Sequence, residues 1–198
     1  MHKRKLIWLT AALALSATAG HHEEQAHSVT DEEQAMAAAM MKAATPGEPH
    51  KMLAKSVGEY DASMSFYMAP DAPPMESTMT VVRTMELEGR VLHEEWSGVV
   101  MGAPFKGVGR TGYDNITGEF WSTWNDNMST GLLLMRGTWD EDQAAIVMTG
   151  ESTHPVTGET YTSRSVGTFP EEGVEAMTMY EDHGEGEFKT MTFKLVRK

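Results

Sequence analysis

The hydrophobic pattern of the chain changes near residue 57. Beyond this point apolar and polar residues alternate with a period of two, as they do in strands that bury one face. Short segments rich in Gly, Asn and Asp separate the alternating runs, so successive runs are predicted to pair antiparallel. The ten predicted strands cover approximately residues 58–68, 75–87, 90–100, 105–113, 119–125, 131–139, 144–151, 159–169, 173–181 and 187–197.

A meander of this length has two unpaired edges unless it closes on itself. The pattern therefore predicts an all-β fold, a ten-stranded antiparallel up-and-down barrel. A two-sheet sandwich is the alternative, but it needs longer connections between sheets than this chain offers.

Helical patterns come before the strands. Thr30 and Glu33 form the two ends of a capping box, and residues 31–44 are rich in Ala and Met, which favour a helix. Thr45-Pro46-Gly47 ends this helix, and residues 49–55 predict a second, short one.

The first residues have the pattern of an export signal. A basic segment, His2 to Lys5, precedes the apolar run Leu6 to Leu15 and the small residues Ala17-Thr18-Ala19. We expect a signal peptide over residues 1–19, a polar tail and helix over 20–49, and the barrel over 50–198. The location is then periplasmic or secreted, after cleavage following Ala19.

Composition restricts the possible functions. The 198 residues include no Cys and carry a formal net charge of -13. Disulfides, thiolate metal sites and cysteine nucleophiles are excluded. The negative charge argues against nucleic acid as a partner, and no apolar run is long enough to predict a membrane span.

The central part of the chain resembles a known family. Residues 101–114 (MGAPFKGVGRTGYD) and 118–126 (GEFWSTWND) are similar to the bacterial domain-of-unknown-function family 1579, and so is the entry segment over residues 50–60. The resemblance implies a calycin-like barrel, of the lipocalin or fatty-acid-binding-protein type. It implies no established activity.

One hairpin allows the register of two strands to be predicted. If Glu88-Gly89 is a two-residue turn, Leu87 faces Arg90 and Arg83 faces Glu94. Arg83 and Glu94 then lie on the apolar face with Trp96, and we predict that they form an ion pair inside the barrel. A slip of one residue would place both side chains outside.

Other side chains are candidates for the ligand site. Arginine recurs near mid-strand at Arg83, Arg110, Arg136 and Arg164, which would create a cationic pocket if several of them faced inward. Alternation supports this only for Arg83, predicts that Arg110 faces outward, and leaves Arg136 and Arg164 open. Trp96, Tyr113 and Trp124 are predicted aromatic walls. Trp121 and Trp124 must face opposite sides of their strand, and either could be the inner one.

Several motifs are better explained by structure than by chemistry. Gly107 to Gly112 match G-x-G-x-x-G, but the helix that should follow is missing, so we interpret these glycines as points where a strand bends. Met177 and Met179 share a face, as copper ligands would, and His93, His154 and His183 are considered as haem ligands. Core methionines and separate surface histidines are the preferred explanations, so neither cofactor and no metal site is predicted.

These observations favour an exported, non-catalytic barrel that binds a small hydrophobic or amphipathic molecule in its lumen, including one with an anionic head group. Arg83, Glu94, Trp96, Tyr113, Trp124 and Arg164 are the candidate ligand-binding residues. An enzyme with Glu94 as a base is one alternative, and a filled barrel with a structural or interaction role is another. Glu94 and Glu95 face opposite sides of their strand, so they do not form an acid–base pair.

Overall fold

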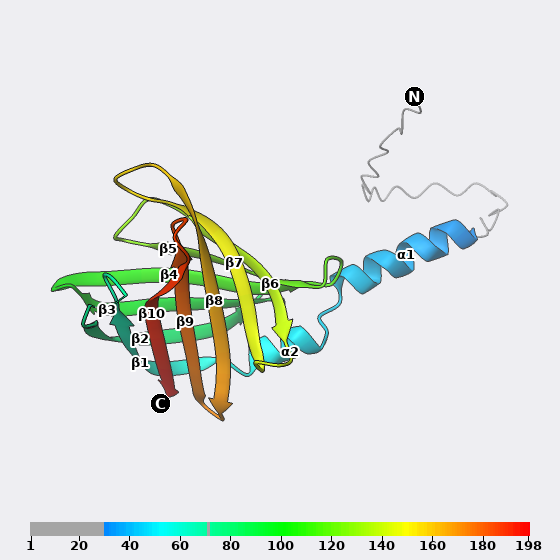
Figure 1. Cartoon of the computed structure of the whole chain (residues 1–198). Helices are drawn as coiled ribbons and strands as arrows, with labels where there is room; N and C mark the ends of the chain where they lie inside the picture. Colours follow the sequence, from blue (N-terminus) through cyan, green and yellow to red (C-terminus); the bar gives the residue numbers. More distant parts are fainter. Residues whose placement is uncertain (1–29, 71) are drawn as a thin grey trace, which may run out of the picture.

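The computed structural model describes residues 30–70 and 72–198, which form two helices followed by a closed barrel (Figure 1). The helices are α1 (Asp31–Ala44) and α2 (Glu48–Ala54). The strands are β1 (Gly58–Phe66), β2 (Met75–Glu86), β3 (Val91–Val100), β4 (Ala103–Asp114), β5 (Glu119–Asp126), β6 (Leu133–Asp140), β7 (Ala145–Thr153), β8 (Thr160–Glu171), β9 (Val174–Asp182) and β10 (Glu187–Arg197).

Every strand pairs antiparallel with its neighbours in sequence, and β1 pairs with β10 to close the barrel. The predicted ten-stranded up-and-down barrel is confirmed. Closure pairs the two edges that an open meander would leave exposed.

The hairpin between β2 and β3 has the predicted register and a longer turn. Arg83 lies opposite Glu94 and Val81 opposite Trp96. The strands end at Glu86 and Val91, so four residues make the turn, and Leu87 and Glu88 have φ angles of 50° and 55°. The register decides which side chains face inward, and the register was predicted correctly although the turn is two residues longer than expected.

The short helix α2 covers one end of the barrel. Leu53 is 4% exposed and packs against Leu92, Phe120 and Ile146, which come from β3, β5 and β7. His50, in the first turn of the same helix, is also buried. Its Nδ1 accepts a hydrogen bond of 3.1 Å from the backbone N–H of Gly47. These contacts close this end of the lumen.

The longer helix α1 extends away from the barrel (Figure 1). Its capping box forms as predicted, because Thr30 and Glu33 exchange hydrogen bonds, but the helix buries no side chain. It is attached through its C-terminal end. Arg90 donates to the carbonyl of Ala44 at 2.7 Å, and Asn115 donates to that of Thr45 at 2.7 Å.

The described helices include none that is long and apolar enough to cross a membrane. The predicted export signal, residues 1–19, lies outside the described residues.

Two glycines of the G-x-G-x-x-G motif make room for inward side chains. A Cβ at Gly107 would collide with the ring of Trp124, and a Cβ at Gly109 would collide with the carboxylate of Glu94. The β3–β4 pairing runs through both positions without a register shift. The glycines therefore leave space for side chains of the neighbouring strands β5 and β3. The bend that we expected there stays a prediction.

We predict that Leu53→Ala lowers the free energy of unfolding by about 2–4 kcal/mol, since a buried leucine leaves a cavity when truncated. Urea unfolding followed by tryptophan fluorescence measures this loss. Val156→Ala, at a side chain that is 87% exposed, is the control and should change stability by less than about 0.5 kcal/mol. Equal effects of the two variants would contradict the role of α2 as a packed closure.

Stability should also depend on the protonation of His50. Burial lowers the pKa of His50, a hydrogen bond with the Tyr113 backbone opposes this shift, and the charge of Arg90 adds to it. The folded state therefore favours the neutral ring, and its contribution is complete above the ordinary histidine pKa of about 6.5 and is lost as the pH falls below it. The urea midpoint should fall as the pH is lowered from about 7.5 to 5.5. The midpoint of His50→Asn should fall less steeply over the same range. An unchanged slope would contradict this assignment.

Candidate functional site

The inward side chains surround a cavity of about 440 Å³. Methionine dominates its wall, with nine residues contributed by most of the strands and two loops. They are Met64, Met79, Met101, Met128, Met135, Met148, Met177, Met179 and Met191. Thioether side chains are flexible and polarisable, so such a wall adapts to ligands of different shape.

An ion cluster lies near the end that α2 covers. Arg83 of β2 donates from Nε to Oε2 of Glu94 at 2.8 Å, and its Nη2 is also 2.8 Å from that oxygen. On the other side, Nη1 of Arg83 donates to Oε2 of Glu175 at 2.5 Å. All three side chains are largely buried, with exposures of 11%, 17% and 15%. The predicted internal pair is therefore part of a triad.

A second layer of groups supports this triad. Tyr60 is completely buried, and its hydroxyl donates to the carbonyl of Ser56 at 3.0 Å and lies 3.3 Å from Oε1 of Glu175. Arg197 donates to the Tyr60 hydroxyl at 2.9 Å and to the carbonyl of Lys55. The end of β10 and the chain after α2 are thus joined to the floor of the cavity.

The triad keeps Arg83 charged. Burial by itself would lower the pKa of Arg83, but the charges and hydrogen bonds of Glu94 and Glu175 outweigh burial and raise the pKa above its ordinary value. A guanidinium with two carboxylate partners is already neutralised. It offers less attraction to an anionic ligand than the single pair predicted from the sequence would offer.

Aromatic rings form one wall of the cavity. Trp96 meets Trp124 edge to face with ring centroids 5.8 Å apart, and it meets Phe193 in the same way at 5.5 Å. Phe105 stacks on Trp124 at 6.4 Å. Trp124 is therefore the inner tryptophan of β5, and Trp121 packs outside against Gly112.

Of the six predicted site residues, four line the cavity: Arg83, Glu94, Trp96 and Trp124. Tyr113 is packed at the end closed by α2, where its ring meets Phe120 at 5.0 Å and His50 at 5.9 Å, and it does not line the cavity. Arg164 is also absent from the lining. It forms a two-point salt bridge with Glu187, with both contacts at 2.7 Å. Neither residue is retained in the candidate site.

Glu175 is the residue of the site that the sequence analysis missed. Glu175, Met177 and Met179 are spaced two residues apart on β9, so they share one face, and all three line the cavity. The expectation that Met177 and Met179 share a face is confirmed, and extending that face by one step would have placed Glu175 inside.

The opposite end of the cavity contains polar groups and reaches the surface. Met101 and Met128 line the cavity and are 65% and 57% exposed, so the entrance lies between their loops. On the β8–β9 side, Glu181 lies 3.0 Å from Nε2 of His183, whose ring meets that of His154 at 5.9 Å. These two histidines, expected to be separate, are neighbours in space.

Two buried polar atoms of the lining residues have no hydrogen-bond partner. They are Nε1 of Trp96 and Oγ of Ser165, and the residues are 4% and 2% exposed. Unpaired buried polar groups cost free energy, and a ligand that supplies a partner removes that cost.

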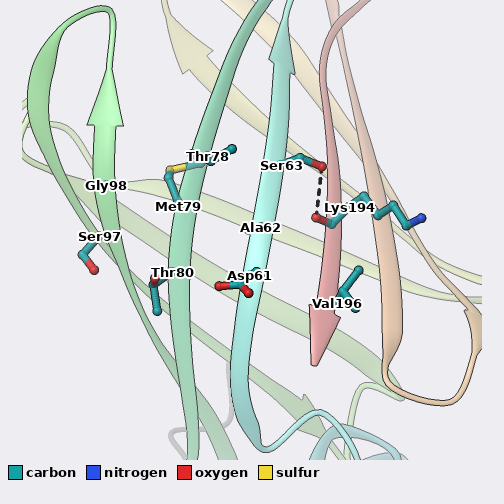
Figure 2. Close-up of a pocket in the computed structure, with 10 residues that line it drawn as sticks. All are labelled: Asp61, Ala62, Ser63, Thr78, Met79, Thr80, Ser97, Gly98, Lys194 and Val196. Atoms are coloured by element: carbon teal, nitrogen blue, oxygen red, sulfur yellow. Dashed lines mark hydrogen bonds between the residues drawn. The ribbon is translucent and has the colours of Figure 1, made fainter. Parts of the chain in front are cut away.

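A second hollow lies on the outer surface of β10, β1, β2 and β3 (Figure 2). Its volume is about 500 Å³, and its outward side chains are short and polar, such as Ser63, Thr78 and Ser97. Lys194 also lines it, and its carbonyl accepts a hydrogen bond of 3.5 Å from the hydroxyl of Ser63. Because these side chains are exposed and do not converge on one point, the lumen remains the candidate site.

No group of three or more His, Asp or Glu side chains suited to hold a metal ion occurs within residues 30–70 and 72–198.

The chain belongs to the family described as "Protein of unknown function (DUF1579)", whose family model matches residues 45–197. This range contains α2 and the whole barrel, and the resemblance inferred from the central segment is confirmed. Comparison with curated proteins gave no match.

We predict that Arg83→Met lowers the free energy of unfolding by about 3–5 kcal/mol at pH 8, because two buried carboxylates lose their partner. Urea unfolding of the variant and the wild type measures this loss.

Arg164→Met is the matched control, since it breaks an arginine–glutamate pair on the outer face and should cost no more than about 1 kcal/mol. Similar losses in the two variants would contradict the structural importance of the internal triad.

Proposed function

We propose that the protein binds a small, mostly apolar molecule in the lumen of its barrel. The observation that carries this proposal is a cavity of about 440 Å³ with an apolar wall and one cluster of charged groups at its floor. Ligand pockets generally measure about 300–1,000 Å³ and combine apolar walls with a few convergent polar groups. A barrel with a purely structural role would fill this space with side chains.

Four features support reversible binding. The exposed methionines at the entrance give an apolar ligand a path to the lumen, and the methionines of the wall adapt to its shape. Trp96 and Trp124 offer flat surfaces for packing. The unpaired Nε1 of Trp96 is available for a hydrogen bond after a small rearrangement.

The proposed setting is outside the cytoplasm, in keeping with the export signal expected over residues 1–19. In that setting the protein would act as a carrier or a sensor of the bound molecule.

The test uses the neutral fluorescent probe N-phenyl-1-naphthylamine, whose emission rises in apolar surroundings. The wild-type protein should bind it saturably with a stoichiometry of one. Met148→Trp enlarges a side chain of β7 that lines the cavity, and it should weaken probe binding at least about tenfold, which corresponds to about 1.4 kcal/mol.

The matched control is Thr149→Trp, which introduces the same residue at the next position, where the side chain is exposed on the outer face. It should bind the probe like the wild type. Circular dichroism confirms that both variants are folded. Absence of probe binding by the folded wild type, or equal weakening in both variants, would reject binding in the lumen.

A further inference from the structure

We infer that the lumen selects ligands with a cationic head group, an ammonium in the simplest case, over ligands with a carboxylate. This inference rests on the proposed function and specifies its ligand class. It reverses the preference that the sequence predicted, because the charges inside the barrel are now known.

The first argument is the charge of the lining. Among the described residues that line the cavity, one carries a positive charge, Arg83. Four carboxylates line the same cavity: Glu94, Asp126, Glu175 and Glu181. Field lines are concentrated in a cavity with walls of low dielectric constant, so this imbalance attracts cations and repels anions inside the lumen.

The second argument is that the guanidinium of Arg83 already has two carboxylate partners. Both carboxylates of the triad contact Arg83 at 2.5–2.8 Å. An incoming carboxylate would have to share the guanidinium with two negative groups within the same cluster. Such like charges at short distance disfavour binding strongly where water is excluded.

The third argument is an acceptor left free in the triad. Both contacts from Arg83 go to Oε2 of Glu94, and in the part of the chain that the structure describes no side chain or backbone group donates to Oε1. That oxygen lies in the space that Gly109 leaves open. An ammonium has donors only, so it matches this free acceptor, and the unpaired Oγ of Ser165 is a further acceptor in the lining of the same cavity.

The carboxylates at the entrance act differently. Asp126 is hydrogen-bonded by Nε1 of Trp124 at 2.8 Å and by the backbone N–H groups of Met128 and Ser129. Glu181 lies next to His183. Their partners hold them in place, so they contribute to the negative field along the path. Glu94 remains the contact for the head group.

The experiment compares three probes with the same alkyl chain, dodecylamine, dodecanol and dodecanoate, at pH 7 and below the concentrations at which they aggregate. Each competes with N-phenyl-1-naphthylamine for the full chain. Dodecylamine should displace the probe at a concentration at least about tenfold lower than dodecanoate, with dodecanol between them.

Two variants distinguish the effect of lumenal charges from that of surface charges, since an acidic protein also attracts cations to its exterior. Glu175→Gln removes one lumenal charge, keeps the Arg83–Glu94 pair and should reduce the amine-to-carboxylate ratio at least about threefold. Glu187→Gln removes one outer charge that is also paired with an arginine, and it should leave the ratio unchanged.

Each outcome has one meaning. Failure of the neutral probe to bind would reject the proposed function itself. Probe binding with dodecanoate equal to or stronger than dodecylamine would overturn the cation preference and leave lumen binding intact. Equal changes of the ratio in both variants would also overturn it, because they would assign the preference to surface charge. The wild-type series can overturn the cation preference even if Glu175→Gln fails to fold.

Discussion

Arg83 connects two parts of the barrel wall that share no backbone hydrogen bonds. Glu94 is on β3, next to the arginine, whereas Glu175 is on β9, which pairs with β8 and β10. The ion triad therefore links β2 and β3 with β9 across the floor of the lumen. Tyr60 and Arg197 extend the connection to β1 and to the chain that leaves α2. A buried charge cluster of this kind is tolerable only when every member keeps its partners.

The same cluster determines the chemistry of the cavity. Without Glu175, the floor would be a neutral pair in which an anionic head group could compete for the arginine. With Glu175, the arginine is satisfied and the excess charge is negative. The wall above is made of methionine and aromatic side chains, which set few constraints on ligand shape. In this account the floor provides selectivity, and the wall provides affinity.

Much of this arrangement follows from local sequence rules. Alternation and turn residues predicted the strands, and the turn near Gly89 fixed the register that places Arg83, Glu94 and Trp96 inside. The predictions that failed concerned contacts between residues far apart in the sequence, or a strand whose residue types do not show which side faces inward. Glu175 meets Arg83 only because the barrel closes. Arg164 was ambiguous because the residues on either side of it on the inner face of β8 are the buried serines Ser163 and Ser165, so no apolar residue marks that face near the arginine. His154 and His183 are far apart in sequence and adjacent only after folding.

The central claim is that a small molecule occupies the lumen above the triad. Native mass spectrometry of the protein purified from the cells that make it tests this claim most directly. The account predicts a reproducible excess mass of one small molecule per chain, which is lost on denaturation and can be identified in the released fraction as an amphiphile with an amine or other cationic group. A folded protein that shows only the mass of the bare chain, and stays bare after incubation with an excess of dodecylamine and of N-phenyl-1-naphthylamine, would contradict it.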